Sequence, residues 1–143
     1  MTSKATSSEN PSVKSILAAL AKRVPKSRHA EAQGFANAFY QRMGSDDAVQ
    51  HGTDGWAALA ADMLEFARTR KRGRANVRLF NPTLKEHGWE SAHTVVQVVN
   101  DDMPFLVDSV TMAVNRSGRT AHWIVHPLLG VQRDAQGRLV KTS

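Results

Sequence analysis

The sequence contains no cysteine, which excludes a disulfide framework, a zinc site built on thiolates and a cysteine nucleophile. It also lacks the GxGxxG and GxxxxGK[ST] loops whose backbone amides cradle phosphate groups. No stretch approaches the ~18 consecutive apolar residues that a membrane helix needs. Residues 1–10 lack the apolar core of a secretion signal. These absences predict a cytoplasmic protein without a membrane partner and without a nucleotide-binding loop of its own.

The remaining composition is that of an ordinary globular domain. The chain has 143 residues, of which 41% are hydrophobic and 22% are charged. Its net charge of +6 is uneven, because residues 1–75 hold 12 basic and 7 acidic side chains whereas residues 76–143 hold 7 and 6. We therefore expect a single core, with the excess positive charge in the first half of the chain.

The first half has the spacing of amphipathic helices. We expect a disordered tail over 1–10 and a helical segment over 11–73, with one helix beginning at Asn10 and Pro11. A second helix is predicted to be capped by Ser27 and to stop at Gly44, and a third to be capped by Thr53. The apolar stripes that predict these helices are Val13, Ile16, Leu17, Leu20 and Val24, then Ala32, Phe35, Ala36, Phe39 and Met43, then Trp56, Leu59, Ala60, Met63, Leu64 and Ala67.

After Gly73 the hydrophobic period changes from 3.6 to 2, and residues 76–143 are predicted to form an α/β module of order ββαββ. The predicted elements are strands at Val77–Phe80, Thr94–Val99, Thr120–His126 with its continuation Leu128–Arg133, and Arg138–Lys141, and a helix bearing Leu106, Val107, Val110 and Val114.

These elements predict a mixed sheet of four or five strands. We expect Thr94–Val99 to be its interior strand, because that strand is apolar on both faces. The following helix should cover one face and lead through a right-handed crossover to a parallel strand. Thr83–Ala92 is predicted to be a polar connection, in which Trp89 is a packing residue that should tolerate substitution better than Val98.

Two groups of polar residues resemble reaction or metal sites. His122 and His126 are four residues apart, but on a strand this spacing separates them by ~13 Å, so we expect no metal site there. Asp101, Asp102 and Asp108 form a carboxylate cluster. The simpler interpretation is that they cap the following helix and interact with the positive end of its dipole. The sequence predicts no catalytic, cofactor-binding or metal-binding residue.

A basic segment ends the helical half. Arg68, Arg70, Lys71, Arg72 and Arg74 lie within seven positions and could contact an acidic partner or RNA. The alternative is a solvated helix end whose cations balance the negative end of the dipole. No aromatic residue is interleaved with the cations, which argues against nucleic acid as the partner.

The second half carries a family resemblance. Val77 to Val140 resembles the N-terminal region of the large bacterial NAD-dependent glutamate dehydrogenases, most specifically in VNDDMPFLVDSV (99–110) and HPLLGVQRDAQGRL (126–139). The helical segment before Arg72 is similar to the start of such chains. The resemblance covers most of this chain, but only the front end of a family whose members are far longer.

The resemblance implies an α+β fold: a helical layer of about three helices, followed by a ferredoxin-like, ACT-like sheet with a helix on one face. It implies a regulatory or assembly role in a parent enzyme that oxidises L-glutamate to 2-oxoglutarate with NAD. The parent's catalytic residues and NAD site would lie elsewhere. The implied partners are the remaining domains of that enzyme, further copies in a homo-oligomer and an amino-acid effector.

The effector, if it binds, is expected where the strand ending at Val99 passes into the helix, because free amides at a helix start suit a carboxylate. The candidate residues are Asp101, Asp102, Met103, Phe105, Asp108 and Ser109. An alternative function is a basic interaction module that uses Arg68–Arg74.

Overall fold

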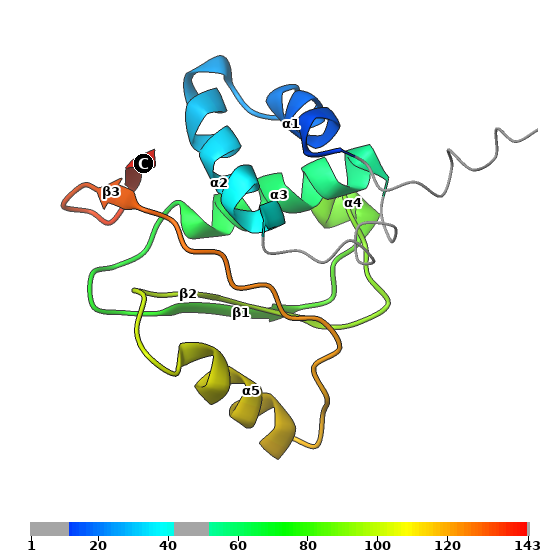
Figure 1. Cartoon of the computed structure of the whole chain (residues 1–143), viewed down its shortest axis with the longest axis vertical. Helices are drawn as coiled ribbons and strands as arrows, with labels where there is room; N and C mark the ends of the chain where they lie inside the picture. The colour runs from blue at the N-terminus through cyan, green and yellow to red at the C-terminus, as the bar shows by residue number, and fades with distance from the viewer. Residues whose placement is uncertain (1–11, 42–51, 143) are drawn as a thin grey trace, which may run out of the picture.

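The computed structural model describes residues 12–41 and 52–142. A layer of helices lies on one side of a two-stranded sheet and a single helix lies on the other side (Figure 1). The helical layer consists of α1 (Val13–Ala21), the 3-10 turn η2 (Lys26–Arg28), α2 (His29–Gln41) and α3 (Thr53–Ala67). The remaining elements are β1 (Asn76–Phe80), α4 (Leu84–His87), β2 (Val95–Val99), α5 (Leu106–Arg116), β3 (Val131–Arg133) and β4 (Leu139–Thr142).

The mixed α+β class is confirmed, and α1, α2 and α3 lie in the first half of the chain, but their caps differ from those predicted. Ser12 caps α1 by accepting a hydrogen bond from the amide of Ser15, whereas Asn10, Pro11 and the predicted stop at Gly44 lie outside the described residues. Ser27 sits inside the 3-10 turn and caps nothing. Gly52 is the N-cap of α3, and Thr53 is its first helical residue.

The core lies between α1, α2 and α3. Ile16, Leu20, Trp56 and Leu59 are each at most 1% exposed, which is the burial that their helical spacing predicts. Burying a large aliphatic side chain contributes about 1.5 to 3 kcal/mol, so these helices supply much of the stability of the fold. None of the helices in the described ranges is both long and apolar enough to cross a membrane.

The predicted sheet is only partly correct. β1 and β2 form an antiparallel pair with Val77 opposite Val98 and Leu79 opposite Val96. Within the described ranges β2 has no second neighbour, so the interior position predicted for Thr94–Val99 is wrong. The two strands connect through α4, a short helix that forms within the stretch 83–92 predicted to be a polar connection.

The predicted strand Thr120–His126 does not form. Trp123 and Val125 are half-buried against the core while Ile124 is 50% exposed, so the period of two is present. Within residues 12–41 and 52–142, however, no neighbouring strand pairs with this backbone, and Pro127 removes an amide that a ladder would use. The parallel crossover predicted after α5 is therefore wrong. The described strands form two antiparallel pairs, β1 with β2 and β3 with β4.

The face of β1 and β2 that packs on α3 carries a polar network. Arg78 donates to the Asp62 carboxylate at 3.0 Å and to the Gln97 side-chain oxygen at 2.9 Å. Gln97 in turn donates to the Met63 carbonyl at 3.0 Å. Trp89 is 3% exposed and its indole N–H donates to Asp62 at 3.0 Å, so its predicted packing role is confirmed. Its greater tolerance of substitution relative to Val98 stays a prediction.

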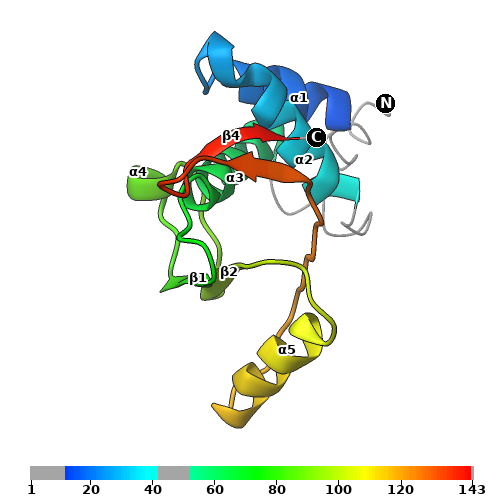
Figure 2. The ribbon, with the colours of Figure 1, turned by 90° about the vertical axis from the view of Figure 1, so that its left-hand side faces the viewer.

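The predicted C-terminal hairpin is confirmed, and it returns to the helical layer beside α2 (Figure 2). The Arg133 guanidinium donates to the carbonyls of Ala67 and Arg68, at 2.8 and 3.1 Å, and so places a cation at the C-terminal end of α3. Gly137 has φ +82° and its missing Cβ would lie 2.2 Å from the Arg70 carbonyl oxygen, so no other residue fits there.

Candidate functional site

The segment predicted to bind an effector begins α5 in an unexpected way. Its N-cap is Phe105, which has φ 64° and makes no side-chain capping bond, so Asp101 and Asp102 do not cap this helix. Phe105 is 75% exposed. Four residues separate Asp101 from the first helical residue, Leu106, which is too far for the capping geometry that was predicted.

The six candidate residues lie before and within the first turn of α5. The Asp101 carboxylate pairs through one oxygen with Arg70, whose side chain is buried, while the Asp101 side chain itself is 73% exposed. Met103 accepts a weak hydrogen bond from the Asn100 amide at 3.6 Å. Asp102, Met103, Asp108 and Ser109 are all exposed, the last two in the first turn of α5.

The structure divides the basic segment into internal and exposed cations. Arg68 pairs with Glu31 in a half-buried ion pair, and Arg70, 7% exposed, pairs with Asp101. Burial, and then the nearby charge of Arg70, lowers the pKa of Arg133, which Asp101 acts to raise. The five cations therefore do not form one exposed surface. The exposed members are Lys71, Arg72 and Arg74.

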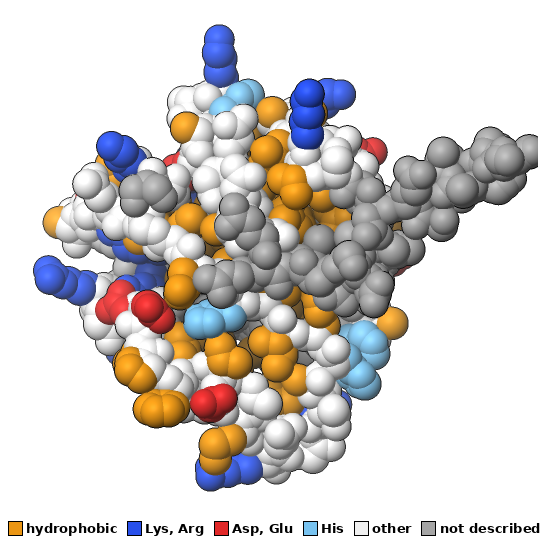
Figure 3. Space-filling view, viewed as in Figure 1, with side chains coloured by type: hydrophobic (Ala, Val, Ile, Leu, Met, Phe, Trp, Pro, Cys, Tyr) orange, Lys and Arg blue, Asp and Glu red, His pale blue; other side chains and the backbone are white. Residues whose placement is uncertain are grey.

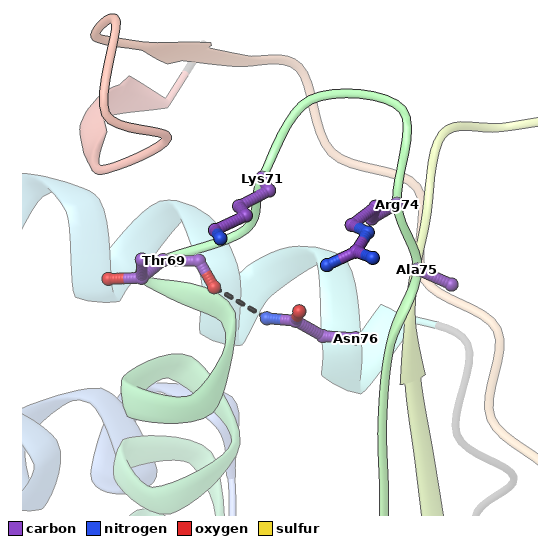
Figure 4. Close-up of a pocket in the computed structure, with 5 residues that line it drawn as sticks. All are labelled: Thr69, Lys71, Arg74, Ala75 and Asn76. Carbon is purple, nitrogen blue, oxygen red and sulfur yellow. Dashed lines mark hydrogen bonds between the residues drawn. The ribbon is translucent and has the colours of Figure 1, made fainter.

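Two of these exposed cations lie at a hollow of about 520 Å³ between the end of α3 and the start of β1. Figure 4 shows the side chains of Lys71 and Arg74 on either side of it, above Asn76. Its lining residues are Thr69, Lys71, Arg74, Ala75 and Asn76, none of which is acidic. Arg72 belongs to the same loop but does not line the hollow.

A second surface is apolar and lies on the sheet face opposite α3, which we call the outer face. It consists of the cross-strand pairs Val77 with Val98 and Leu79 with Val96. Leu79 is 69% exposed, Val77 is 61% and Val96 is 42%, while Val98 is half-buried. Such a run of exposed aliphatic side chains is typical of an interaction surface.

Helix α5 lies on the same side as the outer face but does not cover it (Figure 1). None of its side chains is buried, and its apolar stripe is only half-buried. Met103, Phe105 and Met112 are 49%, 75% and 53% exposed. Figure 3 shows hydrophobic side chains gathered in the lower part of the molecule, over α5 and the extended segment that follows it.

The histidines take part in ring packing. His122 stacks on His93 with ring centroids 4.5 Å apart, and His126 is half-buried four residues further along the chain. Within residues 12–41 and 52–142 no group of three or more His, Asp or Glu side chains is placed to hold a metal ion.

Comparison with known proteins identifies relatives over most of the chain. The family described as "Glutamate dehydrogenase, ACT1 domain" matches residues 35–143. An NAD-specific glutamate dehydrogenase of Halomonas elongata is 35% identical over 131 residues, which are 92% of this chain and 8% of the relative. The NAD-specific glutamate dehydrogenase of Pseudomonas aeruginosa is 35% identical over 105 residues, 73% of this chain and 6% of the relative. No solved structure matches.

Proposed function

Since the chain belongs to the family of glutamate dehydrogenase ACT1 domains, we propose that it is a non-catalytic N-terminal domain that serves assembly or regulation of an NAD-dependent glutamate dehydrogenase. The parent reaction would be the oxidative deamination of L-glutamate to 2-oxoglutarate with NAD as the hydride acceptor. The chain spans 8% and 6% of the two relatives, so most of such an enzyme would consist of other domains.

The observation that carries the assembly role is the outer face. Covering Val77, Leu79 and Val96 would remove apolar surface from water, which is favourable by roughly 25 cal/mol for each Å². The occupant that we propose is another domain of the same dehydrogenase. Other copies in a homo-oligomer are a further proposed partner, and the cytoplasm is the proposed location.

The described residues do not fit NAD. A dinucleotide-binding fold needs parallel strands joined through a helix, with a glycine-rich turn at the start of that helix. The strands described here pair as antiparallel hairpins, and α5 begins at Phe105. We therefore place NAD and the catalytic residues elsewhere in the parent enzyme, and expect this chain alone neither to bind NAD nor to oxidise glutamate.

Two finer parts of the proposal remain predictions. The first is the division into a tail (1–10), a helical segment (11–73) and an ACT-like module (76–143). The second is an amino-acid effector bound near the start of α5. The exposed carboxylates of Asp101, Asp102 and Asp108 suit an ammonium group, and one oxygen of Asp101 also pairs with Arg70.

Two matched substitutions in the full-length dehydrogenase test the assembly role. Leu79 and Leu84 are 69% and 61% exposed, but only Leu79 lies on the outer face. Leu79→Lys should disrupt assembly, measured by light scattering, and lower the glutamate-dependent reduction of NAD. Leu84→Lys should leave both unchanged. If the Leu79→Lys enzyme assembles and turns over like the parent, the outer face has no role in assembly.

A further inference from the structure

We propose that the loop formed by residues 69–76 binds a small ligand with two or more anionic oxygens, such as a dicarboxylate or a phosphate, between Lys71 and Arg74. This binding site is separate from the outer face and from the segment 101–109, which was predicted from the sequence to bind an effector.

A turn brings the two cations to the same hollow. Gly73 has φ +78°, a conformation that glycine adopts without strain, and the amide of Arg74 donates to the carbonyl of Lys71 at 3.1 Å. The chain therefore reverses between Lys71 and Arg74. Both side chains line the hollow, with Asn76 between them (Figure 4).

Internal residues hold this turn in place. The buried Arg70 guanidinium donates to the Arg74 carbonyl at 2.7 Å while it pairs with Asp101. The Asn76 amide donates to the Thr69 carbonyl and so ties the two ends of the loop together. A loop fixed at both points loses little conformational freedom when a ligand binds, which favours affinity.

The charge at the hollow is not neutralised locally. Among the described residues neither Lys71 nor Arg74 is within salt-bridge distance of a carboxylate, and no acidic side chain lines the hollow. Guanidinium and ammonium groups bind carboxylate and phosphate oxygens through charge-assisted hydrogen bonds. No aromatic residue lines the hollow for a base to stack on, so a small anion fits better than RNA.

The test is a titration of the isotope-labelled 143-residue chain, followed by amide chemical shifts. The probes are 2-oxoglutarate and inorganic phosphate, added separately at constant ionic strength, with sodium chloride as the baseline. We expect saturable shifts confined to residues 69–76 with at least one probe. The probe that saturates at lower concentration identifies the ligand as a carboxylate or a phosphate. Failure of both probes to saturate would overturn the proposal.

Matched variants separate a site from diffuse attraction. Lys71→Gln and Arg74→Gln should each weaken binding by about tenfold, because each removes a charge-assisted hydrogen bond. Arg72→Gln removes the same charge from the same loop but should change the affinity by less than about twofold, since Arg72 does not line the hollow. Equal losses in all three variants would overturn the proposal, as would tighter binding of a single-stranded RNA that all three weaken equally.

Discussion

The burial of a leucine side chain differs sharply between the helical core, at Leu59, and the sheet, at Leu79. Leu59 in α3 is 0% exposed and is surrounded by the helical core, whereas Leu79 in β1 is 69% exposed on the outer face. Both belong to regular elements with the apolar spacing expected of buried residues. The difference shows that hydrophobic spacing identifies the face that favours burial, but does not supply the partner that buries it.

The same contrast runs through β1 itself. Arg78 points to α3 and is engaged by Asp62 and Gln97, while Val77 and Leu79 point to the outer face. The polar side chain is thus on the packed side of the strand and the aliphatic ones are on the exposed side. An apolar face left open in this way is the surface that we propose another domain of the dehydrogenase covers.

The largest expected difference comes from truncating the two leucines. Leu59→Ala leaves a cavity in the packed core and should lower the free energy of unfolding by about 2 to 5 kcal/mol. Leu79→Ala should change it by less than about 0.5 kcal/mol, because the side chain is already in water. Urea unfolding of the 143-residue chain measures both. Similar losses from the two substitutions would mean that the outer face is already covered in the isolated chain.

A smaller effect should come from a substitution on the face of the same sheet that packs on α3. Asp62→Ala removes the carboxylate that accepts hydrogen bonds from Arg78 and Trp89, and should lower the free energy of unfolding by about 2 kcal/mol. The control is Glu65→Ala, one helical turn away, because Glu65 is 71% exposed and lies 3.9 Å from Arg28. That control should cost less than about 0.5 kcal/mol. If the two variants unfold alike, the polar network around Asp62 and Arg78 does not anchor the sheet to α3.

A smaller effect than that of Asp62→Ala is expected at neutral pH from Tyr40, which is 5% exposed and donates a hydrogen bond to the Trp56 carbonyl. Tyr40→Phe should cost about 1 kcal/mol there. Burial raises the pKa of the Tyr40 hydroxyl above its usual range. Below pH ~10 the Tyr40 hydroxyl is protonated in both the folded and the unfolded chain. Above pH ~10 it ionises first in the unfolded chain, so Tyr40 should lower the free energy of unfolding by up to about 1.4 kcal/mol per pH unit. The difference between parent and Tyr40→Phe unfolding should therefore shrink from pH 9 to 11, and a constant difference would contradict this.

Local signals in the sequence predicted most of the elements. The apolar periods locate α1, α2, α3, β1, β2 and α5, and the turn at Asp134–Gly137 predicts the final hairpin. These local signals did not predict which strands pair with each other. Residues 120–126 alternate as a strand does, yet no neighbouring strand in the described ranges offers them a ladder of hydrogen bonds. Period alone therefore predicted a larger sheet than the one that forms.

The candidate sites show the same limit. Charge spacing identified the basic segment, but not that Arg68 would pair with Glu31, 37 residues away, or Arg70 with Asp101, 31 residues away. The second of those pairs also engages one oxygen of Asp101, a residue of the predicted effector set. The sequence did carry a signal for the polar network between the sheet and α3. Arg78 is a lone cation within an apolar strand, and a charge in such a position requires a partner.

Amide hydrogen exchange, compared between the isolated 143-residue chain and the full-length dehydrogenase, tests most directly whether another domain covers the outer face. Exchange in β1, β2 and α5 should be markedly slower in the full-length enzyme, because a covered face suppresses local opening. Exchange in α3, whose core is complete in the isolated chain, should be nearly the same in both proteins. Equal exchange in β1, β2 and α5 would contradict the account.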